Sequence, residues 1–284
     1  MDSDRNVPGG QLERRVISVT DNLAPSGRGL GVDGSLHPSG IAAIAREVER
    51  LGYQSFWMNV VAGQSEPTTI LAAALRETSS VDVGIGVVPL DAYDLTRFAT
   101  SVNALPGSRR TVVGLGSGRL RRGVPDFMTH AVAAFREACP GVRVALGGYG
   151  PKMLQLGGSL ADVVCLNWLT PERLAWSLDL VAKGAGQAGR ISTPRLVAYV
   201  RAAVGPDGRE RIHSEWKVYQ SFPHALGTLA GAPPSEPGGI IAERPEEVTA
   251  QMSTYTGVHP VIRPLASSKG DLAELLHLAQ FFAP

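Results

Sequence analysis

Short apolar runs alternate with stretches of helical periodicity along almost the whole chain. Each run is followed by a segment whose apolar residues recur three or four positions apart, as on the buried face of a helix. Such alternation favours a parallel sheet, because a crossover helix is the usual way to return the chain to the start of a parallel neighbour. The predicted strands cover residues 15–20, 55–58, 83–89, 111–116, 142–146, 162–166, 196–204 and 258–262.

The predicted helices begin and end at residues typical of helix termini. Pro38 opens the first helix and Gly52 closes it, while Pro67 opens the second. Eight strand–helix units in 284 residues predict an α/β fold, a closed (β/α)8 TIM barrel, since that architecture typically takes about 250 residues. We expect residues 1–13, which are polar and contain Pro8-Gly9-Gly10, to be a flexible tail, and residues 14–284 to form one barrel domain.

A doubly wound sheet is the alternative fold. It requires a dinucleotide-binding fingerprint, G-x-G-x-x-G, after the first strand. The segment Gly114-Leu115-Gly116-Ser117-Gly118 follows the fourth predicted strand instead, and Arg119 stands where the third glycine should be. The sequence therefore favours the barrel.

Composition excludes several classes of function. The chain is 44% hydrophobic and 19% charged with a formal net charge of +1, which predicts a sizeable core and no general attraction to nucleic acid or membranes. Two cysteines are too few for a disulfide framework, and residues 1–13 lack the apolar core of a signal peptide, so we expect a cytoplasmic protein. The six histidines form no H-x-H or H-E-x-x-H pattern, so we predict no metal site. P-loop and G-x-S-x-G patterns are also missing.

One glycine-rich turn stands at the point where a parallel α/β protein binds its ligand. Gly147-Gly148-Tyr149-Gly150-Pro151 joins a predicted strand to a helix. Free backbone N–H groups at a helix start favour an anion, and small residues permit its close approach. Alternatively, the glycines only turn the chain from strand to helix.

Six segments together carry a resemblance to a known family. They are residues 47–57, 69–74, 83–89, 113–118 and 147–153, and residues 160–162 with 167–172. In this order they resemble the luciferase-like family of flavin and deazaflavin oxidoreductases, also called the bacterial luciferase family. The resemblance implies a (β/α)8 barrel that holds coenzyme F420, or alternatively FMN, across the carboxyl ends of its strands. It also implies a small-molecule substrate and a homodimer.

The same resemblance implies which residues bind the cofactor. The turn that wraps the coenzyme phosphate comprises Gly148, Tyr149, Gly150 and Pro151, and Gly147 before it also binds the cofactor. The third strand ends at Val88 and Pro89, where the family often carries a bulge with a non-prolyl cis peptide; a plain strand end is the alternative. The fourth strand's cofactor-facing end comprises Gly116, Ser117 and Gly118, unless this is a simple turn. Asn167, after the sixth strand, either binds the cofactor or caps its local turn.

Departures from the family bear on the reaction. Deazaflavin-dependent sugar-phosphate dehydrogenases place an Asp-His pair after strand two and a Glu after strand four, where this chain has Asn59-Val60 and Ser117. A positioned base typically contributes about 10²- to 10⁴-fold in rate, so we expect reduction rather than alcohol oxidation. The candidate catalytic residues are Asn59, Ser117 and Asp21, which follows the predicted first strand. An FMN-dependent monooxygenase and a non-catalytic flavin-binding barrel are the alternative functions.

The loop after the fourth strand is short and basic. It contains Arg119, Arg121 and Arg122, close to where the anionic tail of the cofactor would emerge. The deazaflavin coenzyme carries a longer anionic tail than FMN, so the cluster favours the former. Alternatively, the three arginines are an ordinary solvated surface.

Overall fold

The computed structural model of the chain describes residues 27–148, 150–220 and 237–284. Within these residues nine strands form one parallel sheet. The strands are β1 (Gly29–Asp33), β2 (Ser55–Asn59), β3 (Asp82–Pro89), β4 (Thr111–Gly116), β5 (Arg143–Gly147), β6 (Val163–Asn167), β7 (Arg195–Val204), β8 (Ile240–Ala242) and β9 (His259–Pro264).

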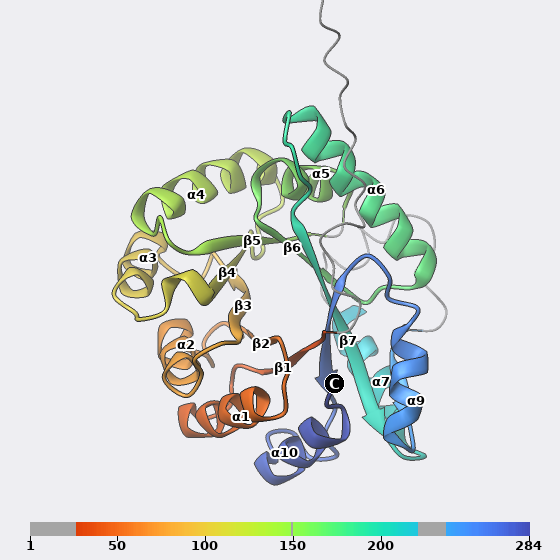
Figure 1. The fold of residues 1–284 in the computed structure, drawn as a ribbon. Coiled ribbons are helices and arrows are strands. Elements are labelled where there is room, and N and C mark those ends of the chain that lie inside the picture. The colour runs from red at the N-terminus through yellow and green to blue at the C-terminus, as the bar shows by residue number, and fades with distance from the viewer. Residues whose placement is uncertain (1–26, 149, 221–236) are drawn as a thin grey trace, which may run out of the picture.

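Eight of these described strands close into a barrel (Figure 1). Each strand from β1 to β6 pairs in parallel with the next, and β9 pairs with both β7 and β1, which joins the two edges of the sheet. The predicted (β/α)8 TIM barrel is therefore confirmed. Closure satisfies the backbone hydrogen bonds of every barrel strand without leaving an edge exposed.

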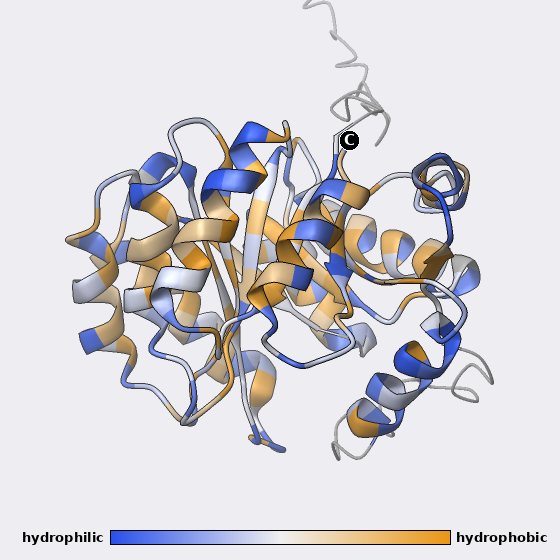
Figure 2. Cartoon of the chain, turned by 90° about the horizontal axis from the view of Figure 1, so that it is seen from below, coloured by the Kyte–Doolittle hydropathy of each residue, from blue (hydrophilic) through white to orange (hydrophobic). Residues whose placement is uncertain are grey.

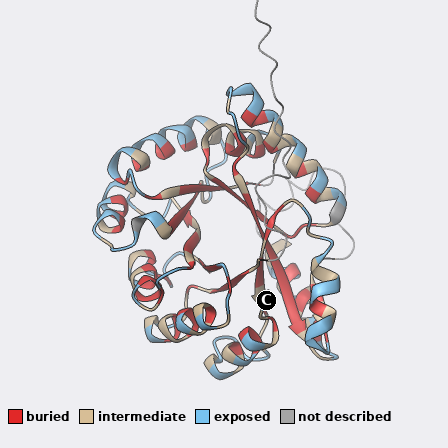
Figure 3. Ribbon diagram, in the orientation of Figure 1, coloured by how far each residue is buried: buried red, intermediate tan, exposed pale blue. Residues whose placement is uncertain are grey.

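Helices surround most of the barrel in Figure 1. They are α1 (Pro38–Arg50), α2 (Pro67–Arg76), α3 (Leu95–Asn103), α4 (Val124–Ala138), α5 (Pro151–Leu160), α6 (Pro171–Gln187), α7 (Gly208–Gln220), α9 (Pro245–Met252) and α10 (Leu272–Phe281), with a short 3-10 helix at Ser108–Arg110. Ile41, Ile44 and Val48 of α1 are buried, whereas Arg46 and Arg50 are exposed. Figure 3 shows this two-sided character around the ring, and Figure 2, turned by 90°, shows hydrophobic and hydrophilic residues on the same helices, as expected of helices that cover a sheet. No helix in the described part of the chain is long and apolar enough to cross a membrane.

The prediction of the first strand was wrong. Barrel strand β1 is Gly29–Asp33, whereas the predicted residues 15–20 lie outside the described residues, as does the predicted tail 1–13. Gly29 and Gly31 face the barrel interior, where a Cβ on Gly29 would lie 2.2 Å from Ser55 Oγ and one on Gly31 3.0 Å from Val261 Cγ1. Close packing inside the barrel therefore outweighs the low strand propensity of glycine here.

Between β7 and β9, the described residues include a strand and a helix that the sequence analysis did not predict. β8 pairs with the last three residues of β7, beyond the point where β6 ends its pairing with the same strand. α9 then leads back to β9. α7 follows β7, but α9 is the helix that directly precedes the last barrel strand.

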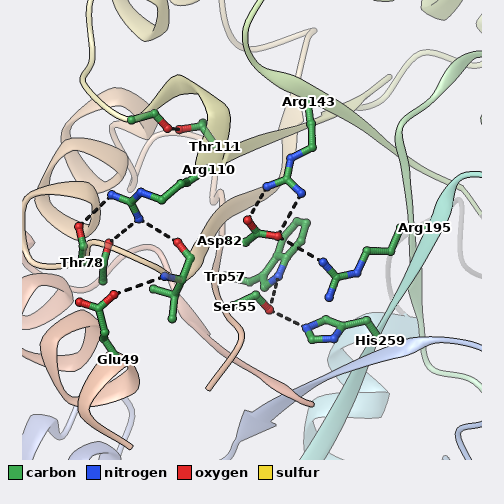
Figure 4. Close-up of polar contacts among 12 residues, drawn as sticks. Glu49, Ser55, Trp57, Thr78, Asp82, Arg110, Thr111, Arg143, Arg195 and His259 are labelled. Carbon is green, nitrogen blue, oxygen red and sulfur yellow. Dashed lines mark hydrogen bonds and ion pairs between the residues drawn. The ribbon is translucent and has the colours of Figure 1, made fainter. Parts of the chain in front are cut away.

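Polar side chains fill the interior at the amino ends of the strands (Figure 4). Ser55 Oγ lies 3.0 Å from Trp57 Nε1, which donates to it, and 2.7 Å from His259 Nε2. Asp82 accepts from Arg143 at 2.6 and 3.0 Å and from Arg195 at 3.2 Å. Burial, together with the charge of Arg195, lowers the pKa of His259 to about 3, so this histidine is neutral at physiological pH. Such a layer at the amino end of a barrel contributes to stability rather than to chemistry.

Two charged side chains hold the turn before β3. Glu49 accepts hydrogen bonds from the backbone N–H groups of Ser79, Ser80 and Val81, the shortest at 2.6 Å. Arg110 donates to the carbonyl oxygens of Thr78 and Val81, both at 2.8 Å. Figure 4 shows Glu49 and Arg110 approaching this turn together. The backbone groups of the turn are thus satisfied by side chains from α1 and from the 3-10 helix before β4.

Candidate active site

The carboxyl ends of the strands form the mouth of the barrel, where enzymes of this architecture place their active sites. Above the apolar middle layer, which includes Trp57, Cys165, Tyr199 and Val261, the next inward positions along the strands are largely polar. They are Asp33 on β1, Asn59 on β2, Asn167 on β6, Arg201 on β7 and Arg263 on β9. The corresponding positions of β4 and β5 are Gly116 and Gly147. The mouth therefore has a polar side and, at the ends of β4 and β5, a bare side where glycines present no side chain.

A bulge in β3 lies on the bare side. The register between β3 and β4 shifts between Ile85 and Val88, and the Gly86–Val87 peptide bond is cis. The bulge therefore lies slightly before the residues to which the resemblance assigned it. Val88 is fully buried in the core around the barrel, and Pro89 pairs with Gly116. Val87 is the residue that the bulge brings against the glycines of the neighbouring strands.

Glycines at the ends of β4 and β5 make room for Val87. A Cβ on Gly116 would lie 2.6 Å from Val87 Cγ2, and a Cβ on Gly147 would lie 2.9 Å from Val87 Cγ1. Both distances are shorter than carbon–carbon contact allows. A larger residue at either position would displace Val87, so the two glycines and the bulge form one packed unit at the mouth.

The predicted phosphate turn leads directly into α5. Gly150 is the N-cap residue, and no side chain caps this helix start. The neighbouring α6 differs, because the Thr170 side chain accepts from the backbone N–H of Arg173 at 3.3 Å. The first turn of α5 contains no acidic residue but does contain Lys152, a charge that the helix dipole disfavours there. Uncapped N–H groups beside a lysine make this helix start suitable for an anion.

Of the residues before Gly150, the structure describes Gly147 and Gly148. A Cβ on Gly148 would lie 2.7 Å from Met153 Cβ, so the turn packs closely against the first turn of the helix that follows. Tyr149 lies outside the described residues. The predicted residues Gly147 and Gly148, before Tyr149, and Gly150 and Pro151, after it, lie at the mouth.

The loop from β4 to α4 is short, as predicted. It spans residues 117–123 and includes Ser117 and Gly118. Asp91 accepts from both the backbone N and the Nε of Arg119 at 3.1 Å, and these hydrogen bonds lower the pKa of that carboxyl group. Arg121 and Arg122 are exposed. Of the three loop arginines, then, Arg119 is tied to a carboxylate, while the other two face solvent.

An ionic network occupies the polar side of the mouth. Glu215, on α7, accepts from Arg201 Nη2 at 3.2 Å and lies 3.7 Å from Arg263 Nε. Asp33 lies 3.5 Å from Arg263 Nη2 and 3.9 Å from Lys269 Nζ. Arg201 is almost fully buried, and its guanidinium lies 4.2 Å from the centre of the Trp168 ring. The sequence analysis missed Glu215, because a single glutamate in a polar helix carries no pattern.

Asn167 is part of the same network. Its Oδ1 accepts from the Arg201 guanidinium and, at 3.1 Å, from the backbone N–H of Trp168. The second of these contacts matches the local capping role that was the alternative for this residue. Trp168, Trp216 and Tyr219 form an aromatic cluster behind it, with ring centres 5.0 to 5.9 Å apart.

The three candidate catalytic residues have different surroundings. Asn59 Oδ1 accepts from the backbone N–H of Gly34 at 2.9 Å, so it ties β2 to the turn after β1. Ser117 follows β4 at the mouth. Asp21 lies outside the described residues, and because β1 was predicted wrongly, Asp33 is the acidic residue at the end of the first strand.

Asp33 is not suited to act as a general base. Burial alone would raise its pKa, but hydrogen bonds from Ser35 and the charges of Arg263 and Lys269 outweigh burial and lower the pKa. Glu215 is likewise held by arginines. Among the described residues no group of three or more histidine, cysteine, aspartate or glutamate side chains is placed to hold a metal ion.

A cavity of about 290 Å³ lies beside the mouth. Its lining comes from the start of α6, from the segment before β8 and from the end of α9, and comprises Leu169, Thr170, Leu174, Pro237, Gly238, Gly239, Thr254 and Tyr255. Burial raises the pKa of Tyr255 to about 12, so this phenol stays protonated. None of the ionic residues of the mouth lines this cavity.

Comparisons with known proteins agree with this geometry. A curated relative, the 5,10-methylenetetrahydromethanopterin reductase of Methanolobus tindarius, is 24% identical over 186 residues, which cover 53% of this chain and 56% of the relative. The match thus spans little more than half the length of that relative. Among solved structures, an F420-dependent secondary alcohol dehydrogenase with an F420-acetone adduct has a TM-score of 0.67 at 16% identity, covering 89% of this chain and 98% of that one.

A second solved structure has the same fold and another cofactor. The oxygenating constituent of 3,6-diketocamphane monooxygenase from Pseudomonas putida, in complex with FMN, has a TM-score of 0.65 at 12% identity and covers 91% of this chain and 97% of that one. The family model of luciferase-like monooxygenases matches residues 20–123 and 118–254, two segments that meet in the loop between β4 and α4. The match covers most of the chain, and the chain therefore belongs to the luciferase-like monooxygenase family.

Proposed function

We propose that the protein is an oxidoreductase that transfers hydride between coenzyme F420 and a small organic substrate, in the direction of reduction. The uncapped start of α5 beside the β3 bulge carries the proposal, because it offers an anion site and a bare surface at one place in the mouth. Relatives named as reductases and as F420-dependent enzymes support this cofactor. We further propose a cytoplasmic homodimer.

The residues of the mouth fit an anionic, ring-bearing cofactor. The backbone N–H groups at the start of α5 and the exposed charges of Lys152, Arg121 and Arg122 would hold its anionic tail. Asn167, Ser117 and the Val87 unit would face its ring. When bound, such a cofactor supplies a ring carbon that gives or accepts a hydride. The chain itself would bind and orient both reactants, and positioning alone contributes strongly to such a transfer.

The paired carboxylates favour reduction. Oxidation of an alcohol needs a base that removes the hydroxyl proton, and its rate gains about 10²- to 10⁴-fold from one. Asp33 and Glu215 are both held in ion pairs with arginine, so neither carboxylate is free to take up the hydroxyl proton. An FMN-dependent monooxygenase is the second candidate, favoured by the family description and by the likeness to an FMN-bound barrel.

Cofactor titration tests the proposal directly. We expect the purified protein to quench the fluorescence of added F420 with saturable binding, and to bind FMN more weakly. Reduced F420 should then be oxidised when a small carbonyl or enone substrate is supplied. Tighter binding of FMN, with oxygen consumption upon reduction, would favour the monooxygenase, and binding without any turnover would favour the non-catalytic barrel.

Two matched variants test the phosphate turn. Gly150→Asp caps the start of α5 with a carboxylate, whereas Gly150→Asn supplies an isosteric cap without charge. Both should fold at least as stably as the parent. The aspartate variant should bind the cofactor at least tenfold more weakly than the asparagine variant at low salt, because its charge occupies the anion site. Equal affinities of the two variants would refute the assignment of the cradle.

A further inference from the structure

The side-chain amide of Asn167 can adopt only one orientation. Two donors, the Arg201 guanidinium and the backbone N–H of Trp168, approach the same amide atom. An amide nitrogen at that place would set a donor against two donors, so the atom must be Oδ1. The Nδ2 group therefore points away from both. It has no hydrogen-bond partner in the part of the chain that the structure describes, and Asn167 is only half-buried.

Arg201 is in turn held by a residue from outside the barrel strands. Glu215 of α7 accepts from Arg201 Nε at 3.3 Å and from Arg201 Nη2 at 3.2 Å. The Trp168 ring lies under the same guanidinium, which restricts it to one plane. The Nη1 group is then the one left to reach Asn167. Glu215, Arg201 and Asn167 thus form a chain of contacts from α7 to the end of β6.

We infer that Glu215 is a positioning residue, which acts through Arg201 to present the Asn167 Nδ2 group as a hydrogen-bond donor to an acceptor oxygen of the ligand in the mouth. The inference rests on the proposed function and adds to it the role of α7. A guanidinium fixed on three sides transmits a defined geometry, which a flexible lysine would not. The ligand atom recognised is a carbonyl or other acceptor oxygen, since Nδ2 can only donate.

Asn167→Asp isolates the donor. The aspartate keeps an acceptor for Arg201 and for the Trp168 backbone, so the variant should fold with a thermal midpoint equal to or above that of the parent. It replaces the donor that faces the ligand with a second carboxylate oxygen. We expect the Kd of F420 or FMN, whichever the parent binds, to rise at least tenfold.

Variants of Glu215 test the positioning role. Glu215→Ala should raise the same Kd at least fivefold, whereas Glu215→Gln, which keeps an acceptor for Arg201, should stay within about threefold of the parent. Glu210→Ala is the matched control, because Glu210 is an exposed glutamate of the same helix, and it should change nothing. A double variant, Asn167→Asp with Glu215→Ala, should bind no more weakly than Asn167→Asp alone, since both changes remove the same contact.

The outcomes separate the inference from the proposed function. A parent that binds neither F420 nor FMN overturns the proposed function and the inference with it. A parent that binds while folded Asn167→Asp binds equally well overturns the inference alone. Additive effects in the double variant would show that Glu215 acts on the mouth independently of Asn167, which also overturns it.

Discussion

Helices α5 and α6 contact each other through their backbones, and one added methyl group should separate them. A Cβ on Gly184 of α6 would lie 2.0 Å from the carbonyl oxygen of Gln155 in α5. A carbon–oxygen contact is normally about 3.3 Å or longer, so Gly184→Ala requires a displacement of roughly 1 Å. The neighbouring Gly186 is the matched control, because it is exposed and a Cβ there would meet nothing within 4 Å.

The two substitutions should have opposite signs. Overpacking costs about 1–3 kcal/mol, and the upper end applies here because backbone atoms cannot rotate away. Alanine regains up to about 1 kcal/mol of helix propensity, which leaves Gly184→Ala destabilised by about 2 kcal/mol. For a domain of this size the thermal midpoint should fall by roughly 4–8 °C. Gly186→Ala gains only the propensity and should raise the midpoint by roughly 1–3 °C.

Thermal unfolding followed by circular dichroism measures both changes, and urea unfolding checks that the dependence on denaturant is unchanged. Because α5 begins at the phosphate turn, Gly184→Ala should also weaken cofactor binding, and Gly186→Ala should not. Equal shifts of the two variants, or a stabilised Gly184→Ala, would refute the backbone contact as the reason for glycine at this position.

Three other predictions concern charge. Burial raises the pKa of Glu49, but hydrogen bonds from backbone N–H groups outweigh burial and lower the pKa to about 2. Glu49→Gln should therefore lower the free energy of unfolding by about 1 kcal/mol at neutral pH, after allowing for solvent screening. In urea unfolding this loss should disappear as the pH falls from 4.5 towards 2. A cost that persists at pH 2 would contradict this. Replacing Arg121 and Arg122 with alanine should weaken F420 binding several-fold at low salt but not at high salt, and should leave FMN binding unchanged; equal F420 affinity at low salt would remove the role of the loop. Chelator treatment should change neither the thermal midpoint nor cofactor affinity, and a loss restored by one added metal would contradict the prediction that the protein has no metal site.

The sequence predicted seven of the barrel strands because each is an apolar run bounded by turn residues. β1 escaped notice since two of its five residues are glycines, which local propensity assigns to a turn. Ser55 and Val261, which are far away in sequence, leave no room for a side chain at these two glycines. β8 escaped for a similar reason, because three residues have too short a pattern and form a strand only by pairing with β7.

Some residues of the candidate site could likewise be predicted from the sequence, and others could not. Gly150 and Asn167 stand directly after strands, so the order of elements alone places them at the mouth. Glu215 reaches the mouth only because α7 packs against the end of β7. The position of α7 depends on β8 and α9, two elements that the sequence analysis did not identify.

The apolar middle layer of the barrel separates the charged side chains at the amino ends of the strands from those at the mouth, which matters for protein engineering. From Ser55 to Asn59 the chain rises about 13 Å, more than the distance over which exposed charges interact at physiological salt. Substitutions of Asp82, Arg143 or Arg195 should therefore alter the free energy of unfolding without altering ligand preference. Laboratory evolution of a new substrate range can diversify the mouth and recover the lost stability at the opposite end, with the gains and losses adding independently.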